Sequence, residues 1–174
     1  MDPLIQFSIP VKGLRDGIHQ YEFQVDDAFF KQFEQSPISE GLLDLTVIFD
    51  KRPDMYILQF DFKGTVKSEC DRCLETIDLP LVDSQRLLVK FSEETEQEEA
   101  DVIFIPRETQ QLNVANYVYE YICLSMPLIK TYDCENDENA VCNEEMLKYL
   151  DEKPAETEET NPIWEALKKL NTKK

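Results

Sequence analysis

Two cysteines, Cys70 and Cys73, stand two residues apart between stretches in which apolar residues alternate with polar ones. A tight turn can bring such a pair to one side, where two thiolates hold two corners of a tetrahedral zinc site. The same spacing forms a redox couple in proteins whose motif opens a helix after a strand. Here the flanking runs, 55–66 and 76–82, place the motif in a turn between two strands. Without a second pair, both cysteines could equally be small apolar residues of that turn.

The second pair is supplied by Cys134 and Cys142, in a polar segment further along the chain. Seven residues separate these two cysteines, whereas about two to four are usual between zinc ligands. One hypothesis is therefore a four-thiolate site, with zinc as the only expected cofactor; its ligands would be Cys70, Cys73, Cys134 and Cys142. The fifth cysteine, Cys123, falls in a predicted helix and is interpreted as a packing residue. An odd number of cysteines is a poor match to an extracellular disulfide framework.

Residues for catalysis are scarce. His19 is the only histidine, which leaves little basis for a Ser-His-Asp or Cys-His arrangement. The four glycines are too scattered for a loop that cradles phosphates. We therefore expect a protein that is not an enzyme.

Acidic residues are concentrated in two runs of the chain. The whole sequence has 18 basic and 36 acidic residues, a net charge of −18, and segments 93–101 and 133–160 carry 15 of those negative charges. The remainder is nearly balanced, so it can present a local basic face to RNA. The acidic runs themselves either bind a basic protein or only keep the protein soluble.

Alternating residues dominate the first two thirds of the chain. Leu43, Leu45, Val47 and Phe49 begin this pattern, which resumes over 56–62 and 87–91 and is typical of half-buried strands. Further strands are expected at 4–9, 18–25 and 102–105, and helices at 28–33, 113–127 and 143–150. The predicted fold class is α+β: an antiparallel meander or partly closed barrel covered by the 113–127 helix.

Three tyrosines of the predicted covering helix differ in position. Tyr117 and Tyr121 share the apolar stripe of that helix and are expected in the core. Tyr119 lies off the stripe, which leaves open that its ring stacks on RNA bases.

Composition divides the chain into three parts. Residues 1–130 form the sheet with its covering helix, and residues 131–160 are acidic, with one short helix and partial disorder expected. Residues 161–174 are predicted to form a basic amphipathic helix that begins at Asn161-Pro162 and carries Trp164, the only tryptophan. This helix either folds back onto the domain or binds a partner.

The order of these features resembles the YceD family, the large ribosomal RNA subunit accumulation proteins of bacteria. The resemblance runs from the strand before Cys70 to the end of the chain and is weaker over the first fifty residues. The matching residues are Cys70, Arg72 and Cys73, the acidic segment 93–101, the helix end with Glu120, Leu124, Met126 and Pro127, Cys134, and the tail residues Asn161, Pro162, Trp164, Leu167 and Lys168.

The resemblance implies a cytoplasmic, non-enzymatic role in accumulation of the large-subunit ribosomal RNA. One hypothesis is direct binding of RNA or of a large-subunit precursor, with neither DNA nor a membrane as partner. Its candidate residues are Lys63, Lys67, Arg72, Arg86, Lys90, Trp164, Lys168 and Lys169. A second hypothesis is an acidic escort, stabilised by zinc, for a basic ribosomal protein. A third is a thiol-disulfide oxidoreductase that uses Cys70 and Cys73.

Overall fold

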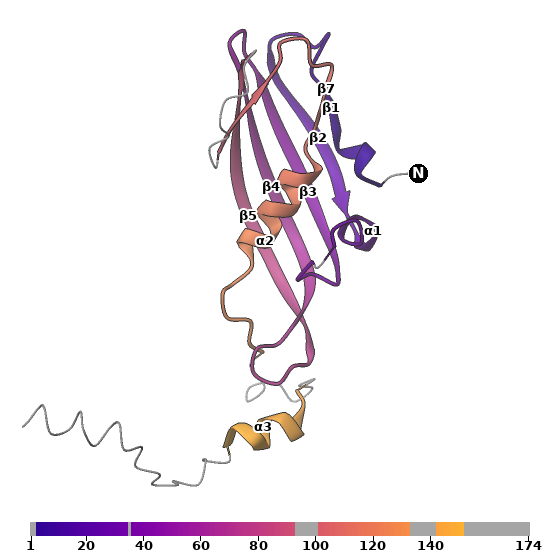
Figure 1. The fold of residues 1–174 in the computed structure, drawn as a ribbon, viewed down its shortest axis with the longest axis vertical. Helices are drawn as coiled ribbons and strands as arrows, with labels where there is room; N and C mark the ends of the chain where they lie inside the picture. The colour runs from indigo at the N-terminus through magenta and orange to yellow at the C-terminus, as the bar shows by residue number, and fades with distance from the viewer. Residues whose placement is uncertain (1–2, 35, 93–100, 133–141, 152–174) are drawn as a thin grey trace, which may run out of the picture.

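The computed structural model describes residues 3–34, 36–92, 101–132 and 142–151. Its main element is a five-stranded sheet with strand order β2-β3-β4-β5-β6 (Figure 1). The strands are β2 (Gly17–Val25), β3 (Glu40–Lys51), β4 (Met55–Glu69), β5 (Thr76–Phe91) and β6 (Val102–Ile105). The predicted α+β fold is confirmed, and the described sheet is not a closed barrel.

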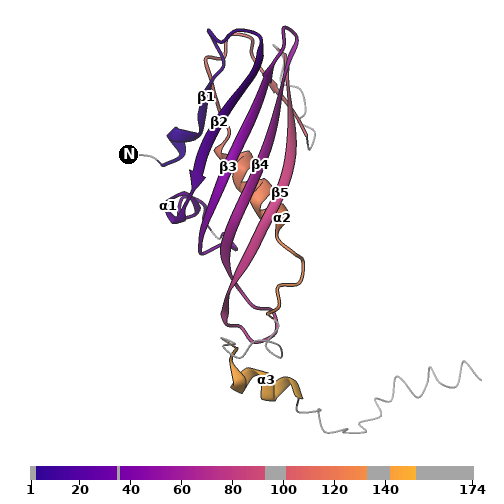
Figure 2. The same cartoon turned by 180° about the vertical axis from the view of Figure 1, so that it is seen from behind.

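Side chains on β3, β4 and β5 alternate between a buried and an exposed face of the sheet. In β3, for example, Leu45 and Val47 are fully buried, whereas Asp44, next to Leu45 in the strand, is exposed. Helix α2 (Ala115–Ser125) covers the buried face, which we call the inner face. Seen from behind, the strands lie in front of α2 and no described helix covers the opposite, outer face (Figure 2). The period of two therefore gives one face to the core and leaves the other open.

The sheet is antiparallel from β2 to β5, as the alternating runs predict. Strand β6 differs, because it lies parallel to β5 with Leu88 opposite Val102. Strands β5 and β6 therefore do not form a hairpin.

The N-terminal residues do not form the strand expected over 4–9. Instead a 3₁₀ helix, η1 (Pro3–Phe7), precedes a three-residue strand β1 (Ser8–Pro10), which pairs with β7 (Gln111–Asn113). The Asn113 side-chain amide donates to the Leu4 carbonyl oxygen at 2.8 Å and to the Ser8 hydroxyl at 3.0 Å. These contacts join segments more than a hundred residues apart, so a tertiary interaction overrides the local pattern.

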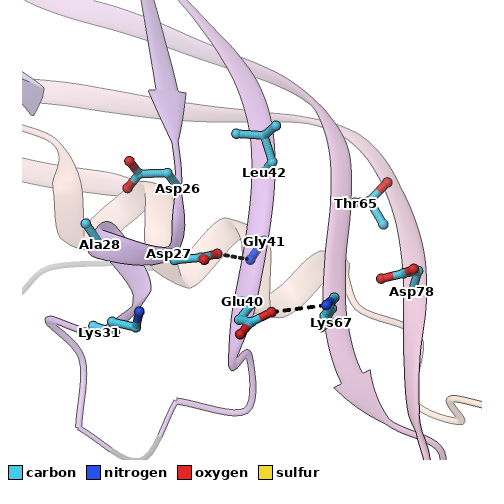
Figure 3. A pocket seen from close by; sticks show the side chains of 10 residues that line it. All are labelled: Asp26, Asp27, Ala28, Lys31, Glu40, Gly41, Leu42, Thr65, Lys67 and Asp78. Atoms are coloured by element: carbon cyan, nitrogen blue, oxygen red, sulfur yellow. Dashed lines mark hydrogen bonds and ion pairs between the residues drawn. The ribbon is translucent and has the colours of Figure 1, made fainter.

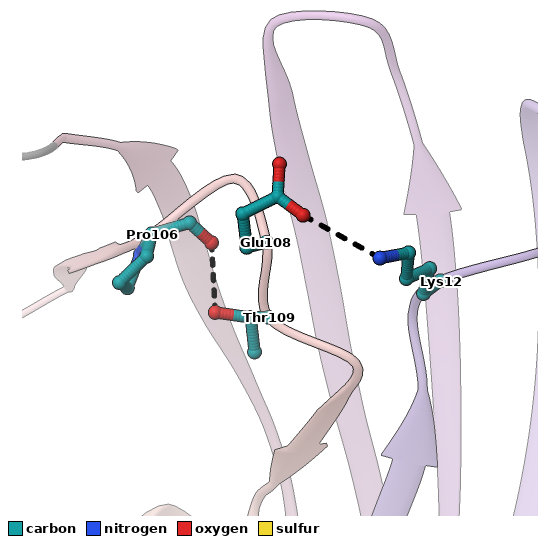
Figure 4. A network of polar contacts seen from close by, with 4 residues as sticks. All are labelled: Lys12, Pro106, Glu108 and Thr109. Carbon is teal, nitrogen blue, oxygen red and sulfur yellow. Dashed lines mark hydrogen bonds and ion pairs between the residues drawn. The ribbon is translucent and has the colours of Figure 1, made fainter.

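The loop between β6 and β7 is tied to the start of the chain (Figure 4). The Thr109 hydroxyl donates to the Pro106 carbonyl oxygen at 2.7 Å, which closes a turn. Lys12, from the loop after β1, approaches Glu108 at 3.4 Å. This exposed pair adds little stability by itself.

Three of the four predicted helices are present, each with slightly different ends, and the fourth, over 161–174, lies outside the described residues. The three are α1 (Asp27–Phe30), α2, and α3 (Glu144–Asp151). In α1, the Asp26 carboxylate accepts the Phe29 N–H at 3.2 Å, and ahead of α2 the Asn113 side-chain oxygen accepts the Ala115 N–H at 3.0 Å. The first is a side-chain cap; at α2 the N-cap residue is Val114, so the Asn113 contact precedes the cap position. The described helices include none that is long and apolar enough to cross a membrane.

Candidate functional site

The cysteine pair lies in the tight turn that connects β4 to β5, as its flanks predict. The Cys70 N–H donates to the Glu75 carbonyl oxygen at 2.8 Å, and the Leu74 N–H donates to the Cys70 carbonyl oxygen at 2.9 Å. Leu74 has a φ of 62°, in the left-handed region that non-glycine residues rarely adopt. The turn thus curls back on itself and directs both cysteines inward, where they are fully buried.

The sulfur of Cys70 is surrounded by hydrogen-bond donors. Burial raises the pKa of this thiol, but backbone N–H groups of Cys73, Arg72 and Tyr132 and the Cys73 thiol donate to its sulfur. The donors prevail, so the pKa of Cys70 lies below the usual value for a thiol. Donors of this kind stabilise a thiolate, which is the form that binds metals.

A clamp between two distant segments positions one of these donors. The Asp71 N–H donates to the Lys130 carbonyl oxygen at 2.7 Å, and the Lys130 N–H donates to the Asp71 carboxylate at the same distance. The Lys130 ammonium adds a weaker contact to the carboxylate at 3.8 Å. Because the clamp holds the segment that follows α2 against the turn, it brings the Tyr132 N–H to Cys70.

The predicted four-thiolate set is only partly within the described residues. Cys134 lies outside them, and Cys142 is disulfide-bonded, whereas Cys70, Cys73 and Cys123 are free thiols. In the part of the chain that the structure describes, no three His, Cys, Asp or Glu side chains form a group that could hold a metal. The zinc site therefore stays a prediction; what the structure shows is a turn that stabilises the thiolate of Cys70.

Four of the predicted cationic residues share the outer face of the sheet. In the register of β4 with β5, Lys67 is opposite Asp78, Lys63 is opposite Val82, Arg86 is opposite Gln59 and Lys90 is opposite Met55. One cation thus occurs at every fourth residue along the strand pair, a step of about 13 Å. We call these four residues the cation row. Arg72 is exposed in the turn beyond the row, and Trp164, Lys168 and Lys169 lie outside the described residues.

The cations of the row differ in their surroundings. Lys67 pairs with Glu40 at 3.1 Å beside an open groove of about 760 Å³ (Figure 3). Its hydrogen bond with Glu40 raises the pKa of Lys67. Lys63, Arg86 and Lys90 are exposed and form no ion pair with another residue of the described part. These three cations are the ones available to an anionic partner.

The acidic residues of the outer face lie mostly on the other two strands. Glu22 of β2 and Asp44 and Asp50 of β3 face the same side as the cation row. On β4, Asp61 accepts hydrogen bonds from Gln59 at 3.0 Å and from the Ser84 hydroxyl at 2.6 Å. The outer face is therefore acidic over β2 and β3, whereas over β4 and β5 the four cations exceed the three acids, Asp61, Glu69 and Asp78, by one.

The tyrosines of α2 are packing residues. Tyr121 is buried, as predicted, and Tyr119, which the sequence left open for RNA, stacks on Phe33 with ring centroids 3.8 Å apart and an angle of 3°. Its ring is thus already covered by a side chain of this protein. Cys123 is half-buried and its pKa is raised by burial, consistent with packing.

Sequence reasoning missed a group of exposed apolar residues around the cysteine turn. Leu74 lies within the turn, Leu124 near the end of α2, and Leu128 and Ile129 just before the Asp71 clamp. The only sequence signal was the apolar pair that follows Pro127. Their exposure depends on how the segment after α2 meets the turn.

Comparison with known proteins identifies the family. A family model described as "Large ribosomal RNA subunit accumulation protein YceD" matches residues 58–171. The chain belongs to this family. Membership in the YceD family gives the protein a role in accumulation of large-subunit ribosomal RNA. The matched region begins within β4 and includes the cysteine turn, the cation row, α2 and α3. No curated protein and no solved structure matches the chain.

Proposed function

We propose that this YceD protein supports large-subunit ribosomal RNA accumulation, in the cytoplasm and without catalysis, by binding RNA of the subunit precursor along the cation row. The observation that carries this proposal is the regular placement of four cations on an uncovered sheet face. Phosphate contacts provide most of the affinity of such binding and depend strongly on salt.

The charge pattern also favours one orientation of the RNA on the sheet. Phosphates are repelled by Glu22, Asp44 and Asp50 on β2 and β3, so the strand of RNA lies along β4 and β5 instead of across the sheet. The row extends over twelve residue steps of β4, a length of about 40 Å. That length accommodates several phosphates of one single strand.

Salt dependence tests the cation row directly. With about 0.7 released counterions for each phosphate contact on a single strand, three to four contacts give a slope of log K against log salt of about −2 to −3. Replacing Lys63, Arg86 and Lys90 together by glutamine should reduce the slope to about −1 or less. Lys12→Gln is the matched control, because Lys12 is exposed and lies outside the row. An unchanged slope in the triple variant, measured by fluorescence anisotropy with a single-stranded RNA oligonucleotide, rules out the row.

We further propose that the cysteine turn binds zinc together with Cys134 and Cys142 in their reduced form. The support is the cluster of N–H donors on Cys70, which favours its thiolate. Native mass spectrometry of protein prepared without chelator should show one zinc mass that is lost in Cys73→Ser. Finding no metal in the reduced protein would leave the turn as packing alone.

A second candidate function is the escort of a basic ribosomal protein. The acidic part of the outer face favours it, since Glu22, Asp44 and Asp50 offer a cationic segment an acidic surface, and the sequence adds two acidic runs. Deleting 93–101 and 133–160 without loss of the bound protein would exclude an escort that works through those runs. A thiol-disulfide oxidoreductase is the weakest candidate, because both thiols of the turn are fully buried and exchange requires access to sulfur.

A further inference from the structure

Three exposed apolar residues lie close to the cysteine turn in the chain or through the Asp71 clamp, and a fourth, Leu124, precedes them on α2. Leu128 is 100% exposed, Leu124 76%, Ile129 72% and Leu74 50%. The Asp71 clamp joins the segment that carries Leu128 and Ile129 to the turn that carries Leu74. We call these four leucine and isoleucine residues the corner patch. Clustered apolar exposure of this kind marks a surface that binds something.

The backbone holds the corner patch outward. Leu74 is fixed in a left-handed conformation by a turn that two backbone hydrogen bonds close. Leu124 is exposed on α2 because Val118, Tyr121 and Ile122 occupy the face of that helix that packs on the sheet. Leu74 and Leu124 are thus presented outward by the backbone conformation of a closed turn and of a helix.

The sequence after α3 contains a segment of complementary chemistry. Ile163, Leu167 and Leu170 recur at helical spacing, with Trp164 beside them. As a helix, residues 161–170 would be about 15 Å long, with one apolar stripe to bury. Four lysines, at 168, 169, 173 and 174, accompany the stripe. At the cysteine turn, Glu69 and Glu75 are the carboxylates that these lysines would pair with, and Arg72 is an exposed base of the same turn.

The tether between α3 and this segment is short. Helix α3 ends at Asp151, below the cysteine turn in Figure 1, and its Leu147 packs against the hydrophobic core cluster that includes the cysteines. Ten residues lead from 151 to 161, so the segment can reach as far as about 35 Å from the end of α3. A short tether gives the segment an effective concentration in the millimolar range at a site on the same chain. A site with a dissociation constant of about 0.1 mM would then be occupied about ten times more often than empty, at any protein concentration.

We propose that residues 161–174 dock as an amphipathic helix on the corner patch of the same chain, burying Trp164 there. This inference goes beyond the RNA contact of β4 and β5, because it concerns a different surface and uses none of the cation row. Docking places the tail lysines beside the cysteine turn.

The single tryptophan makes the test specific, because all tryptophan fluorescence of this chain comes from Trp164. The probe is neutral acrylamide, and the measured quantity is the Stern–Volmer quenching constant in native buffer and in urea. The variant is Leu128→Asp with Ile129→Asp, at two exposed positions where the fold tolerates a polar residue. The matched control is Ile18→Asp with Val82→Asp, at residues 74% and 72% exposed on the outer face of the sheet.

Docking predicts a quenching constant in the native protein at least three-fold lower than in urea. The corner variant should lose this protection and approach the urea value, while the control variant keeps it. Circular dichroism of both variants establishes that the sheet is intact. Full quenching of the native protein, equal protection in the corner variant, or protection that appears only as protein concentration rises would each overturn the proposal. The last result would indicate a second copy as the occupant. None of these results bears on the salt slope of RNA binding.

Discussion

Replacement of Asp71 by alanine probes the clamp that assembles the cysteine corner. The carboxylate accepts the Lys130 N–H at 2.7 Å and lies 3.8 Å from the Lys130 ammonium. A hydrogen bond to a charged acceptor contributes about 1.5–3 kcal/mol, and the lower end applies because the Asp71 side chain is 44% exposed. The ion pair adds less than about 1 kcal/mol. We expect Asp71→Ala to lower the free energy of unfolding by about 1.5 kcal/mol.

Asparagine at the same position is the matched control. Its amide oxygen can still accept the Lys130 N–H, and only the charge is lost. We expect Asp71→Asn to lower the free energy of unfolding by about 0.5 kcal/mol, the value of a partly exposed ion pair. Urea denaturation followed by circular dichroism measures both variants, with midpoints compared at equal slope.

The same variants should differ in the chemistry of Cys70. Alanine keeps the backbone half of the clamp but loses its carboxylate half, which loosens the Tyr132 N–H from the sulfur, so the pKa of Cys70 should rise in Asp71→Ala and change little in Asp71→Asn. The pH midpoint of thiol alkylation, measured with chelator so that no metal competes for sulfur, reports this shift. Equal unfolding energies for the two variants, or identical alkylation midpoints, would refute the role assigned to the clamp.

Three further outcomes follow from the structure. Tyr121→Phe should raise the free energy of unfolding by about 1 kcal/mol in urea, because the buried Tyr121 hydroxyl has no hydrogen-bond partner among the described residues, whereas Tyr149→Phe at an exposed position should change nothing. Gly64→Ala should cost about 3 kcal/mol in the same assay, since a Cβ there would meet the Leu42 backbone carbonyl of the neighbouring strand. Because the pKa of Cys70 is lowered in the folded state, its thiolate stabilises the metal-free fold, and this contribution is complete above the thiol's unfolded pKa near 9. The contribution is lost as pH falls through the lower folded pKa. The difference in free energy of unfolding between the wild type and Cys70→Ser should therefore shrink toward neutral pH.

The alternation of residues predicted the sheet because one of its faces is buried. Leu45, Phe60 and Leu87 are core residues of three successive strands, as their period-two runs indicate. The same logic fails for 4–9, where Phe7 is buried but within a 3₁₀ helix. A short apolar segment fits several local conformations, and here the Asn113 side chain, from the other strand of the small sheet, selects among them.

The candidate site, like the fold, follows from the sequence only in part. The position of Cys70 and Cys73 in a turn between strands follows from their flanks, and Lys63 and Lys67 share a face because four residues separate them on one strand. The alignment of these lysines with Arg86 and Lys90 depends on the register of β4 with β5. Register is set by the whole hairpin and the packing of its inner face.

Sequence alone determined the fold class, the strand-to-strand turn of the two thiols, and the separation of acidic runs from a nearly neutral body. Only the tertiary structure decided that Lys130 meets Asp71, that Tyr132 donates to the sulfur of Cys70, and that four apolar side chains stay exposed beside them. Local periodicity reports which face of a strand or helix is buried, because neighbouring residues share one element. It carries no information on which loop another loop will meet, since that depends on the lengths and packing of every element between them.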